Sequence, residues 1–154
     1  MARSEKKSRR LVVDGTTFLW KVGHRHERVN GLAQGCREVL ALHPLDGRGR
    51  LEITFSGGPG RAVPDGLLPS GAVGTGGAYL NLHEPGTVRA LLEEAVTTHG
   101  WCTDDAAPRC IDGWTLFDVV SARRHEGDAG PQRGATDRSD RPADPAVSLR
   151  APQV

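Results

Sequence analysis

The sequence predicts a small α+β domain, with an antiparallel sheet of about five strands and one helix packed on one face. Three observations lead to this class. Two β-rich runs flank an Asp-Gly pair near the N-terminus, a second hairpin follows, and an amphipathic helix precedes a last β-rich segment. At 154 residues the chain has the size of one domain. We divide it into a flexible basic leader (residues 1–8), a single domain (9–120) and a disordered tail (121–154).

The first hairpin is expected over residues 9–22, around the strong turn signal Asp14-Gly15. Two registers fit: Leu11 faces Phe18 if the loop is Asp14-Gly15, and Trp20 if the loop lies one residue later. In both registers one face carries Leu11, Val13, Phe18, Trp20 and Val22, because cross-strand pairs share a face. The other face carries Arg10, Thr17 and Lys21, with Val12 and Leu19 as apolar exceptions.

A second hairpin is expected after a loop at residues 29–35, which Asn30-Gly31 marks. Residues 36–43 are apolar enough for a third strand, although their Leu and Ala would also suit a short helix. Residues 50–56 alternate between apolar and polar, which is typical of a half-buried strand. We expect that strand to pair with residues 39–42.

A Gly-rich and Pro-rich stretch follows over residues 56–78. Glycine and proline both oppose regular structure, so we expect an irregular surface loop here. A loop of bare N–H groups can hold a phosphate, but residues 71–77 match neither nucleotide-binding fingerprint.

The expected helix covers residues 85–99, with Pro85 in its first turn. Gly100 suits the left-handed residue that ends a helix, and Trp101 would pack back on Val96. The apolar stripe that would face the sheet consists of Val88, Leu91, Leu92, Ala95 and Val96.

The last part of the domain is expected to be a polar connection (residues 102–112), a tight turn at Asp112-Gly113 and a final strand (residues 114–120). Beyond residue 120 the chain has no aromatic residue and many charges of both signs. Such a composition cannot bury enough apolar surface to offset the cost of ordering, so we expect disorder there.

Composition excludes several classes. No apolar run approaches the roughly 18 residues that span a bilayer, and the N-terminus lacks an apolar segment of signal-peptide length. Three cysteines are too few for a disulfide framework. We therefore expect a cytoplasmic protein with reduced thiols, no membrane partner and no cofactor.

Residues 9–22, read as R-R-L-V-V-D-G-T-T-F-L-W-K-V, resemble the opening of a family of small uncharacterised bacterial proteins, commonest in actinomycetes. The pattern of that family is R-R-x-[VI]-V-D-G-x-x-[YF]-x-W-x-V. Its members tend to continue with a Pro-initiated helix ending in Gly-Trp and then a strand, and residues 84–101 and 114–120 are similar. The resemblance implies the fold and brings no activity with it.

His24 and His26 are the first candidates for chemistry. An H-x-H pair on a strand points both imidazoles to one side, where they can bind one metal ion or serve a hydrolase or nuclease. By parity they extend the face of Trp20 and Val22, unless Gly23 forms a bulge. The alternative without a function is that both histidines lie at a strand end that is exposed to water.

Two further groups are weaker candidates. His99, Cys102 and Cys110 are ligand types for zinc, although their spacing matches no common zinc motif. Asp104, Asp105 and Asp112 could bind a cation, but loop and cap roles explain them more simply.

Nucleic-acid binding is a further alternative, because residues 1–28 are basic whereas residues 29–120 are acidic. Clustered cations gain affinity for phosphates through counterion release, and this contact would be unspecific. The residues proposed for it are Lys6, Lys7, Arg9, Arg10, Arg25 and Arg28.

No nucleophile elbow, zinc-protease motif or phosphate-binding loop is present in the sequence. Our leading interpretation is therefore a non-enzymatic protein-interaction or accessory module. Its uncovered sheet edge or face would meet another protein or a second copy of itself. Nucleic-acid association and a His24/His26 hydrolase remain the alternatives.

Overall fold

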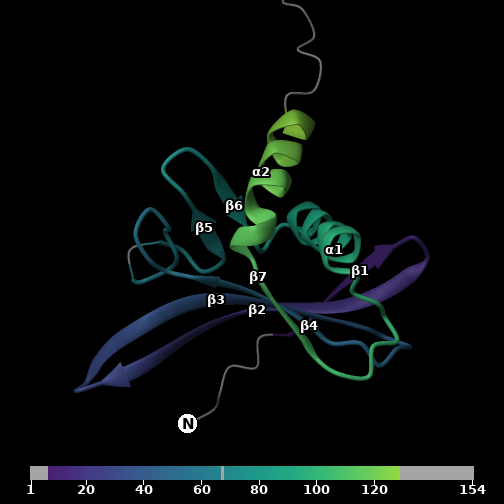
Figure 1. Ribbon diagram of the computed structural model, residues 1–154, viewed down its shortest axis with the longest axis horizontal. Coiled ribbons are helices and arrows are strands. Elements are labelled where there is room, and N and C mark those ends of the chain that lie inside the picture. Colours follow the sequence, from purple (N-terminus) through teal and green to yellow (C-terminus); the bar gives the residue numbers. More distant parts are fainter. Residues whose placement is uncertain (1–6, 67, 129–154) are drawn as a thin grey trace, which may run out of the picture.

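The computed structural model describes residues 7–66 and 68–128, and it confirms the α+β class and the five-stranded sheet. Two helices and a short two-stranded ribbon lie on one side of that sheet (Figure 1). The strands are β1 (Arg9–Val13), β2 (Thr16–Val29), β3 (Leu32–Pro44), β4 (Leu51–Ser56), β5 (Ala72–Gly74), β6 (Tyr79–Asn81) and β7 (Arg109–Asp112), and the helices are α1 (Pro85–His99) and α2 (Trp114–Asp128).

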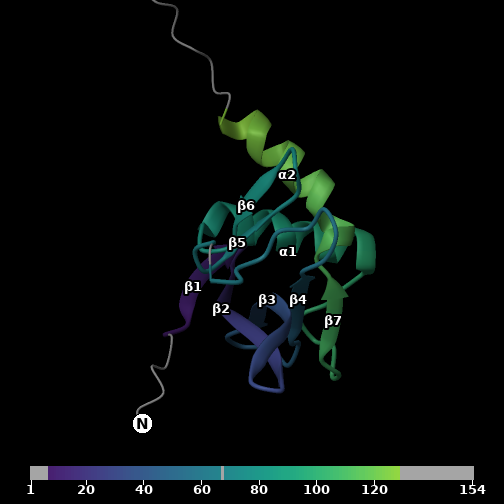
Figure 2. The ribbon, with the colours of Figure 1, turned by 90° about the vertical axis from the view of Figure 1, so that its left-hand side faces the viewer.

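The sheet has the order β1-β2-β3-β4-β7. The first four strands form an antiparallel meander in chain order, and β7 then pairs in parallel with β4, with Ile111 opposite Ile53. The sheet is therefore mixed rather than wholly antiparallel. A parallel neighbour needs a long crossover, and α1 lies in that connection (Figure 2).

The first hairpin has the register with a two-residue loop at Asp14-Gly15, in which Leu11 faces Phe18. Asp14 and Gly15 have φ angles of 48° and 80°, the left-handed values that a hairpin turn matching strand twist requires. Val13, Phe18, Trp20 and Val22 are buried, and Leu11 is partly buried, so the predicted apolar face is confirmed.

The expected loop at residues 29–35 is wrong. Asn30-Gly31 forms a second two-residue turn with φ angles of 51° and 80°, and Val29 pairs directly with Leu32. Strands β2 and β3 therefore run on to this turn as one long hairpin, which projects beyond the sheet (Figure 1). We call residues 24–37 of this hairpin the arm.

The Gly-rich stretch is more ordered than expected. Strand β5 is fully buried and pairs with β6, with Val73 opposite Leu80. Both side chains belong to the core, which explains why a segment with so many glycines keeps a fixed course. Apart from β5, the described residues between 57 and 78 form only isolated bridges, turns, bends and irregular backbone.

Helix α1 has the predicted limits. Gly100 has a φ of 62°, and its N–H donates to Val96 O at 3.0 Å. Trp101 is buried, with its ring centroid 6.2 Å from that of Phe18, whereas Val96 of the predicted stripe is exposed.

The expected strand at residues 114–120 is wrong, because this segment opens helix α2. Asp112 Oδ1 accepts the N–H of Trp114 at 3.1 Å and so satisfies a donor at the helix start. Leu116, Phe117 and Val120 are buried at helical spacing and join the core. Residues 121–128, expected to be disordered, continue α2, and residues 129–154 lie outside the described residues.

Candidate functional site

The root of the arm holds a fully buried acid. Glu38 on β3 lies directly opposite His24 on β2, and its Oε1 is 2.7 Å from His24 Nδ1. The other carboxyl oxygen, Oε2, accepts the N–H of Gly71 at 3.0 Å. The side chain of Glu38 has no exposed surface, so these two contacts replace the water that it gives up on folding.

Sequence reasoning did not single out Glu38. Its signal was present, because Glu38 shares the inward parity of Leu40 and Leu42 along the strand. An acid at an inward position needs a partner, and His24 is its cross-strand neighbour.

His26 lies beside His24, with their ring centroids 5.4 Å apart. The bulge in this region does not involve Gly23. The pairing shifts between Arg25 and Glu27, and Gly35 of β3 has a φ of 61°.

His24 and His26 are the residues for which the sequence predicts a metal site. In the described part of the chain, no three His, Cys, Asp or Glu side chains are arranged to hold a metal ion. A carboxyl group on Nδ1 is nevertheless the usual way to orient an imidazole whose Nε2 binds a metal or moves a proton. Metal binding and catalysis by His24 and His26 stay predictions.

A Ser–His pair adjoins the buried acid. Ser70 Oγ is 3.2 Å from His83 Nε2, and a Cβ on Gly71 would lie 2.5 Å from His83 Cδ2. Gly71 thus contacts the His83 ring and donates its N–H to Glu38. No local pattern predicts that Ser70 and His83 come together, since they lie on either side of β5 and β6.

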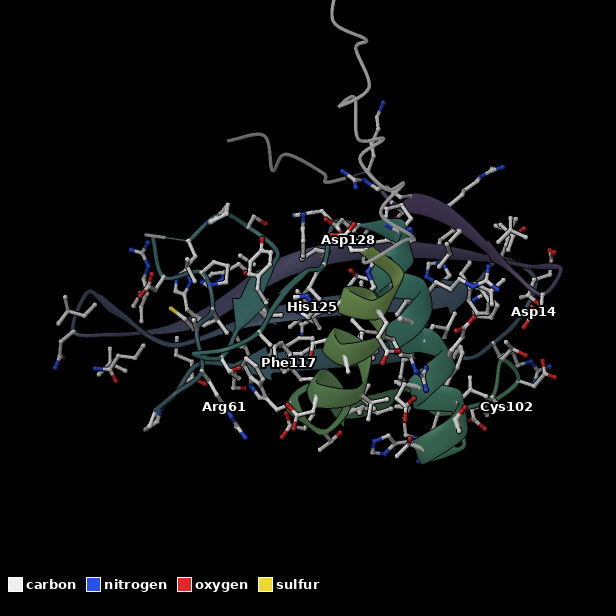
Figure 3. All side chains as sticks on the ribbon, turned by 90° about the horizontal axis from the view of Figure 1, so that it is seen from above. Asp14, Arg61, Cys102, Phe117, His125 and Asp128 are labelled. Carbon is white, nitrogen blue, oxygen red and sulfur yellow. The ribbon has the colours of Figure 1, made fainter. Side chains whose placement is uncertain are left out.

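The other candidate groups serve the local structure. His99 Nε2 is 3.3 Å from Thr115 Oγ1, Asp105 accepts the N–H of Cys102, and Asp112 caps α2. Figure 3 shows Cys102 and Asp14 toward the same end of the molecule, away from the arm. Cys36, Cys102 and Cys110 are free thiols.

The predicted nucleic-acid residues that the structure describes lie on β1, on β2 and just before β1. Arg9 lies over the Trp20 ring, 5.3 Å from its centroid, and donates to the carbonyl of His83. Lys7 and Arg28 are exposed, and Lys6 lies outside the described residues.

Arg25 reaches across the uncovered face of the sheet to Glu52, which accepts two hydrogen bonds from its guanidinium at 2.9 and 3.2 Å. These hydrogen bonds raise the pKa of Arg25 above its ordinary value. We call this uncovered side, opposite the helices, the open face. Its alternating positions carry the cations Arg10, Lys21, Arg25, Arg37 and Arg50, the acids Glu27, Glu52 and Asp112, the apolar side chains of Val12, Leu19, Val39 and Ala41, and the imidazole of His43.

The arm has an open edge. Strand β1 pairs with β2 only as far as Trp20, so from Lys21 to Val29 the outer edge of β2 meets no strand in the described ranges. At the tip, the side chains of Val29 and Leu32 face each other and are exposed by 44% and 68%.

Comparisons with protein families, with curated proteins and with solved structures found no match to this chain. No helix in residues 7–66 and 68–128 has the length and apolar character to cross a membrane.

Proposed function

We propose that this protein is a non-enzymatic interaction module that binds another protein chain through the arm. The observation that carries the proposal is the open edge of β2 from Lys21 to Val29. Such an edge presents a row of unpaired N–H and C=O groups, onto which an extended strand can add.

The length of the arm and the apolar side chains at its tip support this function. A two-stranded ribbon without further neighbours has marginal stability in water, yet β2 and β3 continue well past the strands that flank them. Val29 and Leu32 add apolar surface at the tip, where a second chain would cover it. We expect this binding to occur in the cytoplasm.

A photo-crosslinking amino acid at Arg28 in the full chain, expressed in its native cells, tests the proposal. Asp118 on α2 provides the control, because it is exposed on the helix side of the sheet. Discrete protein adducts from position 28, absent from position 118, are the expected result. Equal adducts at both positions, or none at position 28, would overturn it.

Unspecific nucleic-acid binding is the second candidate, and the charges of the open face favour it. Cations outnumber acids on that face, and counterion release would reward their contact with phosphates. At the described sheet positions of the open face there is no Phe, Tyr or Trp ring on which bases could stack, and His43 offers an imidazole alone, so we rank this function second.

Duplex binding measured against salt tests this second candidate. K21E should weaken binding uniformly across sequences and lower the salt slope, whereas R89E on α1 should change neither. Binding that is insensitive to salt would exclude it.

A further inference from the structure

We infer that the arm binds a second copy of this chain, with the two β2 edges paired antiparallel and the two His26 residues directly opposite. This inference rests on the proposed function, because it names the strand that the open edge receives. Residues 23–29 of one copy would lie along residues 29–23 of the other. This overlap is close to the commonest strand length of about 5–6 residues.

The charges of the arm match in this register. A twofold axis at His26 sets Arg25 of each copy opposite Glu27 of the other, and both positions share the open-face side of β2. Opposite charges directly across two strands stabilise their pairing. Moving the axis to the neighbouring residue, Arg25 or Glu27, would instead place like charges against each other.

Arg25 remains available for this contact although it binds Glu52. Glu52 lies beyond β3, whereas Glu27 of the second copy would lie at the outer edge of β2, so Arg25 exchanges one acid for the other. The Arg25–Glu52 pair is exposed, with 51% and 31% of the two side chains accessible, and an exposed ion pair contributes little to stability.

The shapes of the two edges also match. The same register places Val29 of one copy opposite Gly23 of the other. Val29 is 44% exposed, and a Cβ at Gly23 would meet no atom within 4 Å. The free space beside Gly23 thus receives the valine side chain, which would otherwise face water.

Sedimentation equilibrium of the full chain, from micromolar to near-millimolar concentration, tests the pairing. An interface of two short strands is small, so we expect a reversible dimer with a micromolar dissociation constant. E27R should raise that constant on the order of tenfold, because it places cations opposite each other twice. The double variant R25E/E27R should regain most of the loss, and E126R on α2 should leave the constant unchanged.

A disulfide crosslink tests the register. Opposite residues in an antiparallel pair have Cα atoms about 4.5–5.5 Å apart, within disulfide reach. Mild oxidation of His26→Cys should give a dimer whose crosslink maps to position 26 in both chains. Lys21→Cys should give none, because position 21 would face the turn of the second copy.

The outcomes separate the two proposals. A protein that stays monomeric at every concentration, or whose dimer ignores E27R, overturns the self-pairing inference. If position 28 then still crosslinks to a different protein, the interaction function stands with another partner. If position 28 yields no adduct at all, both proposals fail.

Discussion

The imidazole of His24 lies 2.7 Å from the carboxyl group of Glu38, and this contact joins the root of the arm to a side chain with no exposed surface. Because Glu38 also binds Gly71, one acid connects β2, β3 and the Gly-rich segment. The consequence is a stability role for His24 that His26 does not share.

We expect His24→Ala to lower the free energy of unfolding by about 2–3 kcal/mol, because it leaves a buried carboxyl oxygen without a partner. Urea denaturation measures the difference. The control His26→Ala should change stability by less than about 0.5 kcal/mol, since its ring is exposed. Equal losses in the two variants would contradict this role of Glu38.

Gly113, at the start of α2, fits tightly against the core. A Cβ there would lie 2.5 Å from the Phe55 ring, so Gly113→Ala should cost about 1–3 kcal/mol through overpacking. Gly127 has open space around it, and Gly127→Ala should stabilise the protein by up to about 1 kcal/mol. Thermal unfolding of both variants should therefore show shifts of opposite sign.

Two leucines of β3 should differ sharply in their effect on stability. Leu40 is fully buried, and Leu40→Ala should cost about 2–5 kcal/mol through lost burial and a cavity. Leu32 at the tip of the arm is 68% exposed, and Leu32→Ala should cost less than about 0.5 kcal/mol. A large loss for Leu32→Ala in dilute solution would show that the tip is covered within the monomer.

The start of α2 depends on Asp112. Asp112→Ala removes the acceptor for the N–H of Trp114 and should cost about 1 kcal/mol. Asp118→Ala, at an exposed position of the same helix, should change stability by no more than about 0.5 kcal/mol. Comparable losses in the two variants, measured by denaturation followed by circular dichroism, would argue against a capping role.

Local signals predicted the elements that depend on neighbouring residues. The Asp14-Gly15 signal placed the turn of the first hairpin but left two registers open, of which the structure has the one with Leu11 opposite Phe18. Pro85 and Gly100 marked both ends of α1. Asn30-Gly31 is the same kind of two-residue turn signal. The prediction of a loop at residues 29–35 therefore missed that β2 and β3 continue to this turn and form the arm.

The predictions failed where contacts between segments distant in the sequence decide the local structure. Residues 114–120 are rich in β-formers, but contacts of Leu116 and Phe117 with the core favour a helix over their intrinsic preference. Strand β7 is short and polar, and its place beside β4 is set by contacts far apart in the sequence. The meeting of Ser70 with His83 is non-local in the same way.

The order of the layers along the chain has a consequence for synthesis on the ribosome. The antiparallel meander is complete at Ser56, whereas its cover begins only with α1 at Pro85 and ends with α2. At about 5–20 residues per second, translation leaves the inner side of the meander uncovered for seconds. During that interval Trp20 and Leu40, which are buried in the finished fold, have no helix of their own chain to cover them.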